Sequence, residues 1–269
     1  MPRLLSILLV ALMVGCATTQ PTQAPPDPIA LITTAATNIR SASTFRISVN
    51  ETGPDYMLYT DYATVYFRQA TAQYVAPGMM QATIRVLAAG LPIEVQVFSR
   101  GADQWYRAIW TGDQWVNQPF AAGFNPETLV AEDTGFQAAM KALIGLKYVG
   151  LEQLETGEQV DHLAATANGP DVAALLGDLI EPVGTVEVDV YVDTSTKFPA
   201  RFVITEHDSP YAVTPQAGQQ AQPVVWTIDL NDINAPADIA TPEALNATPE
   251  ATGNLLAPET EAATPEASS

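Results

Sequence analysis

The sequence predicts an α+β protein in which one strongly curved antiparallel sheet, a half-open barrel, wraps around about three helices. Between residues 28 and 233 apolar and polar residues mostly alternate, which is typical of strands with one buried face, and three segments have helical spacing instead. Consecutive strands joined by short turns pair in the antiparallel sense. A long twisted sheet tends to curl, and amphipathic helices are available to cover its apolar face.

Three segments carry helical spacing and helix boundary residues. The first starts at Asp27 and Pro28, which suit an N-cap and a first turn. The second starts in the same way at Asn125 and Pro126 and reaches Gly145, and Gly135 indicates a break within it. The third lies between two prolines, at 170 and 182. The apolar faces of these segments contain Ile32, Ala35, Ala36 and Ile39; then Phe136, Met140, Leu143 and Ile144; then Val172, Leu175, Leu176 and Leu179.

The remaining segments of the domain are predicted strands. They are rich in β-branched and aromatic residues and are separated by turn residues. Two DQW sequences flank Thr111-Gly112, which predicts a hairpin there. The expected strands are residues 44–52, 56–75 (one long or two shorter strands), 83–87, 93–98, the two arms of 104–116, 148–154, 159–167, 185–193, 198–206 and 224–230.

Residues 1–15 resemble a bacterial lipoprotein signal peptide. Arg3 precedes an apolar run that is too short to span a bilayer, and the sequence Met-Val-Gly before Cys16 resembles a lipobox. An ordinary secretory signal is the alternative, but Cys16 is the only cysteine and lies where a lipobox needs it. We therefore expect acyl chains on Cys16 to anchor the protein outside the cytoplasm, on the outer face of the cell membrane or elsewhere in the cell envelope.

Two segments outside the predicted domain, residues 28–233, have the composition of flexible chain. Residues 16–27 combine the lipidated cysteine with a linker rich in Pro and Thr. Residues 234–269 contain three ATPEA repeats, six acidic residues and no Lys or Arg, which predicts a disordered acidic tail. A glycosylated stalk or a cell-wall contact is the alternative for this tail.

The composition excludes nucleic acid as a partner. The 269 residues include 30 Asp and Glu against 11 Lys and Arg, a formal net charge of −19, so no basic surface can neutralise phosphates. Only 15% of residues are charged and 47% are hydrophobic, which is enough apolar material for a substantial core.

No motif in the chain predicts catalysis, a metal site or a cofactor. His162 and His207 each follow or precede an acid in a strand, but neighbouring strand residues point to opposite faces, so neither pair is arranged as a proton relay. A single cysteine and two histidines provide no zinc-site spacing. We expect no enzyme; a hydrolase with an unrecognised site is the remaining enzymatic alternative.

The apolar residues between helices and sheet have two interpretations that sequence spacing does not separate. If the layers meet tightly, these residues form a filled core. If the sheet curls away from the helices, they line an apolar cavity suited to acyl chains. The candidate lining residues are Ile32, Ile39, Ile84, Val86, Val95, Val97, Phe136, Met140, Leu143, Ile144, Val188, Val190 and Val192.

Several short motifs resemble the LppX/LprA/LprF/LprG lipoprotein family, whose fold is similar to that of the lipoprotein carriers LolA and LolB. They are the lipobox with its linker, Ser43-Thr44-Phe45-Arg46, residues 72–77 (AQYVAP), residues 80–86 (MQATIRV), Trp115 and Asn125-Pro126. The resemblance covers most of residues 28–206. One departure is Val160-Asp161-His162, where Val-Asp-Gly is typical, so the local turn geometry can differ.

This resemblance implies a lipoprotein that binds, and transfers through the envelope, acylated lipids or lipoglycans held between sheet and helices. A lipid ligand, the membrane and an envelope transporter are then the expected partners. The alternative is an envelope sensor or scaffold with the same fold and a filled core. Such a protein would bind a protein partner through an exposed aromatic hairpin formed by Trp105, Tyr106, Trp110 and Trp115. The favoured interpretation of these four aromatics is that they are ordinary residues packing on the sheet.

Overall fold

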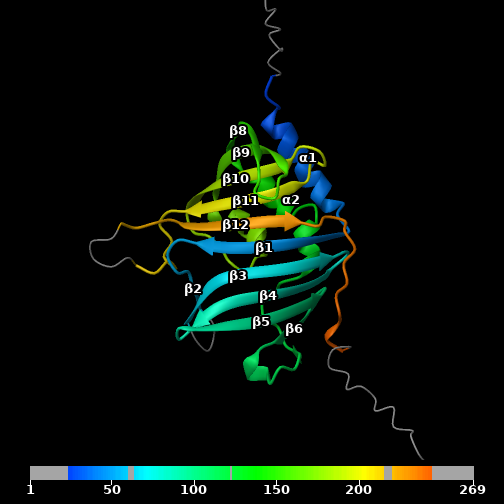
Figure 1. Cartoon of the computed structure of the whole chain (residues 1–269), viewed down its shortest axis with the longest axis vertical. Helices are drawn as coiled ribbons and strands as arrows, with labels where there is room; N and C mark the ends of the chain where they lie inside the picture. Colours follow the sequence, from blue (N-terminus) through cyan, green and yellow to red (C-terminus); the bar gives the residue numbers. More distant parts are fainter. Residues whose placement is uncertain (1–23, 60–63, 122, 215–219, 244–269) are drawn as a thin grey trace, which may run out of the picture.

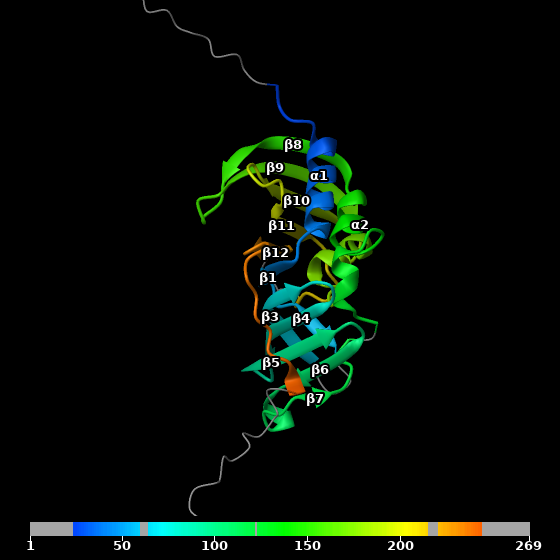
Figure 2. The same cartoon turned by 90° about the vertical axis from the view of Figure 1, so that its right-hand side faces the viewer.

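One open antiparallel sheet of twelve strands dominates the computed structural model, which describes residues 24–59, 64–121, 123–214 and 220–243. The order of strands is β7-β6-β5-β4-β3-β1-β12-β11-β10-β9-β8, and β2 pairs with β3. The helices pack on one face of this sheet, and β8 and β9 curve around the end that holds α1 (Figures 1 and 2). The predicted fold class is therefore confirmed.

Most strands are close to their expected positions. The long segment after Tyr56 is two strands, and the two strands on either side of Ala89-Gly90 are longer than predicted. The strands are β1 (Thr44–Thr52), β2 (Met57–Tyr59), β3 (Thr64–Val75), β4 (Met79–Ala88), β5 (Leu91–Arg100), β6 (Asp103–Arg107), β7 (Val116–Asn117), β8 (Ile144–Gln153), β9 (Gln159–Asn168), β10 (Thr185–Asp193), β11 (Pro199–Glu206) and β12 (Val224–Asn231).

The first and last strands meet at the centre of the sheet. β1 pairs with β12 on one side and with β3 on the other, with Ile47 opposite Leu230 and Ala72. This pairing joins a half built from β3–β7 to a half built from β8–β12. Apolar residues at alternate positions of both halves face the helices and form one continuous core.

The helical segments are shorter than expected. They are α1 (Pro28–Arg40), α2 (Gly135–Lys141) and three 3₁₀ segments, η1 (Ile109–Thr111), η2 (Pro126–Val130) and η3 (Gly169–Leu176). The second predicted helix is divided at Gly135, where φ is 61° and a Cβ would lie 2.1 Å from the carbonyl oxygen of Leu129. The chain therefore turns sharply there, and only glycine fits. Contrary to prediction, Ile144 does not belong to this helix but begins β8.

The aromatic hairpin predicted at residues 104–116 is only partly formed. β6 is followed by η1, and β7 has two residues. Trp105 and Trp115 are buried with Phe98 on the sheet face opposite the helices, as expected of aromatic residues that pack on the sheet and not of an exposed hairpin. Trp110 remains 59% exposed.

The first ten residues of the expected tail pack against the sheet. Asn234 accepts a hydrogen bond from the Ser43 amide at 2.8 Å, and Ile239 packs on the Phe98–Trp105–Trp115 cluster. Glu243 pairs with Arg100 at 3.2 Å. In Figure 2 this orange segment runs down the side of the sheet from β12 toward β6. Residue 233 is therefore too early as the end of the packed domain, whereas residues 244–269 lie outside the described part.

We expect Ile239→Asp to lower the free energy of unfolding by about 1–2 kcal/mol, because it removes apolar contact with the aromatic cluster. Chemical denaturation followed by tryptophan fluorescence measures the change. Asp238→Asn, at the exposed neighbouring position, is the control and should have the stability of the parent chain. Equal stability of the two variants would show that the segment does not cover the cluster in solution.

Candidate functional site

Helix α1 forms one wall of the candidate site. Asp27 caps it by accepting a hydrogen bond from the Ile29 amide at 3.1 Å, and Pro28 occupies the first turn. Its buried face packs on the core through Leu31, Ile32, Ala35, Ala36 and Ile39. Ile29 lies beside this face and is 59% exposed. The side of α1 toward α2 and β8 is therefore apolar but incompletely covered.

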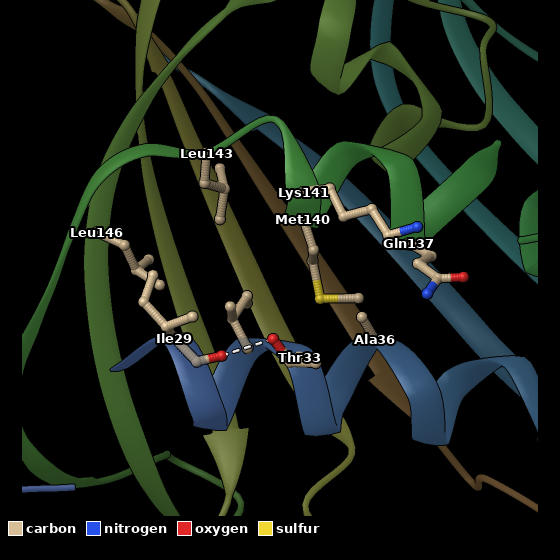
Figure 3. Close-up of a pocket in the computed structure, with 9 residues that line it drawn as sticks. Ile29, Thr33, Ala36, Gln137, Met140, Lys141, Leu143 and Leu146 are labelled. Carbon is tan, nitrogen blue, oxygen red and sulfur yellow. Dashed lines mark hydrogen bonds between the residues drawn. The ribbon is translucent and has the colours of Figure 1, made fainter. Parts of the chain in front are cut away.

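A pocket of about 230 Å³ lies between α1, α2 and the start of β8. Apolar side chains surround most of it, and Lys141 and Gln137 of α2 bring the polar groups (Figure 3). In that view Ile29 and Leu146 lie at the end away from these two residues. The lining residues are Ile29, Ile32, Thr33, Ala36, Gln137, Met140, Lys141, Leu143 and Leu146.

Of the three polar lining residues, Thr33 donates its hydroxyl hydrogen bond to the carbonyl oxygen of Ile29 at 2.7 Å, whereas Gln137 and Lys141 have few partners within the described ranges. Gln137 is 8% exposed, and its Oε1 is buried with no hydrogen-bond partner among the described residues. The Lys141 ammonium reaches only the carbonyl oxygen of Glu132, at 3.5 Å, and forms no ion pair in this part of the chain. A buried acceptor and an exposed ammonium group thus lie at one end of an open, largely apolar pocket.

Only three of the thirteen predicted lining residues, Ile32, Met140 and Leu143, line this pocket. Ile144 is 63% exposed, because it starts a strand at the sheet edge instead of continuing α2. Ile84 and Val95 are partly buried on β4 and β5. The other predicted lining residues are buried, namely Ile39, Val86, Val97, Phe136, Val188, Val190 and Val192.

Behind the pocket the space between helices and sheet is filled. Phe136 of α2 has no exposed surface and stands between Phe45 of β1 and Phe202 of β11, with ring centroids 5.9 and 6.1 Å apart. Val190 of β10 is also fully buried in the same cluster. In this structure these residues are core, and the pocket is a separate space at the edge of that core.

Sequence reasoning missed six lining residues. Ile29, Thr33 and Ala36 recur at helical spacing and could have been recognised as a stripe along the edge of the buried face of α1, to which Ala36 itself belongs. Leu146 lies two residues before Tyr148 in β8, so both side chains point toward the core. No sequence pattern indicated that Gln137 and Lys141 line the pocket, since both have the character of solvent-facing helix residues.

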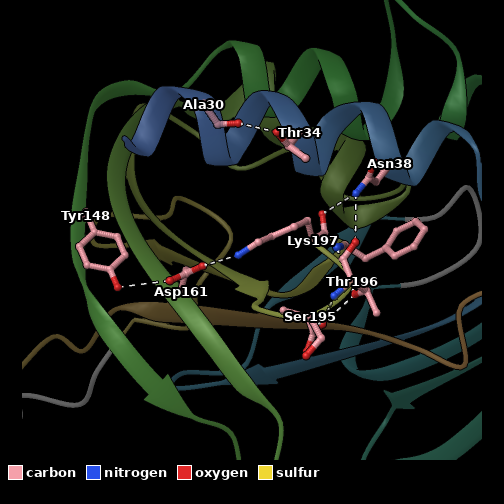
Figure 4. Close-up of polar contacts among 10 residues, drawn as sticks. Ala30, Thr34, Asn38, Tyr148, Asp161, Ser195, Thr196 and Lys197 are labelled. Carbon is pink, nitrogen blue, oxygen red and sulfur yellow. Dashed lines mark hydrogen bonds and ion pairs between the residues drawn. The ribbon is translucent and has the colours of Figure 1, made fainter. Parts of the chain in front are cut away.

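On its other side α1 is held to the sheet by polar contacts (Figure 4). The amide nitrogen of Asn38 donates to the carbonyl oxygens of Thr196 and Lys197, both at 3.1 Å. The Lys197 ammonium contacts Asp161 at 3.1 Å, and the Tyr148 hydroxyl donates to the same carboxylate at 3.2 Å. These bonds connect α1 to the turn between β10 and β11 and, through Lys197, to β8 and β9.

The two histidines lie in different environments on the outer strands. His162 stacks on Tyr191, and its ring nitrogens lie 2.7 Å from Glu152 and 2.8 Å from Asp189. Its neighbour Asp161 points to the opposite, helix-covered face, as the strand alternation predicts. His207 lies 3.4 Å from Glu187 at an exposed site. Within the described residues, no group of three or more His, Cys, Asp or Glu side chains is arranged to hold a metal.

A second polar feature is buried at the far end of β1. The Glu51 side chain is 2% exposed, 3.8 Å from Arg68, which bonds Asp55 at 2.7 Å. Burial raises the pKa of Glu51 to about 7, an effect that Arg68 opposes. Burial also raises the pKa of Glu206, which accepts a hydrogen bond from the Val183 amide at 2.9 Å.

Comparison with solved structures identifies the architecture. LprF from Mycobacterium bovis aligns with a TM-score of 0.56 and 14% sequence identity, over 81% of this chain and 99% of that one. The chain has the fold of this protein. The Mycobacterium tuberculosis lipoprotein LppX aligns with a TM-score of 0.51 and 14% identity, over 80% of this chain and 100% of that one. The fold expected from the resemblance to these lipoproteins is thus confirmed.

Sequence comparisons add nothing to this fold assignment. No protein-family model matches the chain, and no curated protein matches it. None of the described helices is long and apolar enough to cross a membrane.

Proposed function

We propose that this protein is a bacterial envelope lipoprotein that binds acylated lipid between its helices and its sheet and transfers it. The observation that carries the proposal is the apolar pocket between α1, α2 and β8, in a fold shared with LprF and LppX. The lipobox sequence at Cys16 supports the same function, because a protein anchored on a membrane has lipid within reach. No cofactor and no bond chemistry are part of this function.

Binding would be driven by burial of alkyl chain, at about 0.8 kcal/mol for each methylene removed from water. Because the core behind the pocket is filled, a ligand can bind only in the pocket itself in the present conformation. A larger ligand requires α1 to separate from α2 and the sheet, and the bonds from Asn38 to the β10–β11 turn oppose that movement. Release to a second membrane or to an envelope transporter would use the same movement.

The filled core also favours a second candidate function, that of an envelope sensor or scaffold which binds a protein. Phe136 and Val190 leave no space behind the pocket, as expected for a binding module without cargo. Burial of Trp105 and Trp115 leaves Trp110 as the exposed tryptophan of the predicted aromatic surface. This function therefore lacks the broad aromatic patch that the sequence indicated.

Lipid extraction from the purified protein tests the first function. The protein carries Cys16→Ser, which removes the attached acyl chains from the measurement, and mass spectrometry identifies what co-purifies. We expect acylated lipid at close to one molecule per chain, and a higher melting temperature when that lipid is added back. An empty protein whose melting temperature does not respond to added lipid would exclude lipid carriage and leave the protein-binding function.

A further inference from the structure

From the shape and polarity of the pocket, we infer that its ligand is a single-chain anionic amphiphile with a hydrogen-bond donor in its headgroup, such as a lysophospholipid with a glycerol headgroup. The inference rests on the proposed lipid-binding function and specifies which class of lipid this site takes.

The size of the pocket selects one chain. Its volume of about 230 Å³ is below the roughly 300–1,000 Å³ of sites for drug-sized ligands, so it cannot enclose two acyl chains. It cannot extend inward, because Ile39 and Phe136 behind it are fully buried in a packed core. One alkyl chain lying along α1 would place its end near Ile29 and Leu146, which lie at the end of the pocket away from Gln137 and Lys141 (Figure 3).

The polar end selects the headgroup. Lys141 has no ion pair among the described residues and can hold an anionic group, such as a phosphate or carboxylate. Gln137 Oε1 is a buried acceptor without a partner in the described ranges. The lost hydration of this oxygen costs free energy unless a donor forms a hydrogen bond with it. A ligand hydroxyl next to the anionic group would satisfy this oxygen, and both side chains come from α2, one turn apart.

Lysine is scarce in this acidic chain, and one of its lysines lines the pocket. The chain has a formal net charge of −19 and only three lysines, at 141, 147 and 197. Lys141 and Lys147 lie on either side of the segment that connects α2 to β8, and Lys197 lies under α1. Of these three lysines Lys141 is the one that lines the pocket, since Lys147 lies outside it and Lys197 is paired with Asp161 at 3.1 Å.

Calorimetric titration of the full chain carrying Cys16→Ser with myristoyl lysophosphatidylglycerol, below its micelle concentration, tests the inference. We expect one molecule bound per chain, with affinity rising about fourfold per methylene along a chain-length series and then reaching a plateau. Lys141→Glu should weaken binding at least tenfold. The matched control Lys147→Glu makes the same charge change outside the pocket and should stay within twofold of the parent.

Two more variants separate ligand loss from unfolding. Leu143→Trp fills the pocket and should abolish binding. Gln137→Leu should weaken binding several-fold while leaving the melting temperature equal or higher, because it removes a buried acceptor without a partner. A structural role alone for Gln137 would lower the melting temperature instead, and that result would remove it from the site.

Three ligand comparisons give distinct outcomes. If uncharged myristoyl glycerol bound with the same affinity as myristoyl lysophosphatidylglycerol, the role of Lys141 would be overturned. If the two-chain lipid dimyristoyl phosphatidylglycerol bound tightly and Lys141→Glu had no effect, the single-chain assignment would be overturned, while the proposed lipid-binding function would stand. If neither the one-chain nor the two-chain lipid binds, this inference and the proposed function both fail.

Discussion

Val190→Trp is expected to lower the free energy of unfolding by about 3 kcal/mol or more, whereas Leu143→Trp is expected to change it by less than about 1 kcal/mol. Val190 is fully buried in β10, opposite Leu163 of β9 and Phe202 of β11. An indole cannot enter that position without moving its neighbours. Leu143 is partly exposed beside the pocket, where an indole has room.

Urea denaturation of the two variants and the parent, followed by circular dichroism, measures this difference. Val190→Leu is the conservative control and should lie between the parent and Val190→Trp. If Val190→Trp were as stable as the parent, space would have to exist between β10 and the helices, and the core would be an open cavity in solution. The experiment therefore also decides between the two interpretations of the apolar residues.

The strands could be predicted because the signal for each is local. The alternation of Val186, Val188 and Val190 with acids identifies β10 whatever it pairs with, and the structure buries each of these valines. The helix α1 has a cap, a proline and an apolar stripe within thirteen residues. The curled sheet then follows from strand number and the short connections between consecutive strands.

The site could not be predicted, because it depends on where segments end and what lies against them. The helical pattern from Phe136 to Ile144 continues past Lys141, but the chain turns into β8 there, which exposes Ile144 and leaves Leu143 at a pocket. The acidic, proline-containing composition after residue 233 gives no sign of the apolar contact that Ile239 makes on the opposite face of the sheet. Both features are tertiary, and spacing along the chain does not encode them.

Glu51→Gln is expected to stabilise the protein at pH 8 by about 2 kcal/mol and to leave its stability near pH 4.5 unchanged. The Glu51 carboxyl is buried at the end of β1, and its Oε1 has no hydrogen-bond partner among the described residues. Burial raises its pKa from 4.5 to about 7, so the folded protein holds a proton that the unfolded chain has released in this interval. Glutamine has nearly the same shape and no charge to bury.

The sign of the pH dependence follows from proton uptake. Between pH 4.5 and about 7 the native state binds more protons than the unfolded state, so the free energy of unfolding falls as the pH rises through this window. Glu51→Gln removes that contribution and should make the decline shallower, while burial of Glu206, whose pKa is also raised, maintains part of it. Denaturation curves from pH 4.5 to 8 for the parent, Glu51→Gln and the exposed control Glu158→Gln measure the slopes. If the parent and Glu51→Gln had equal slopes, Glu51 would be ionised in the folded protein across this range, held by Arg68 at the buried end of β1.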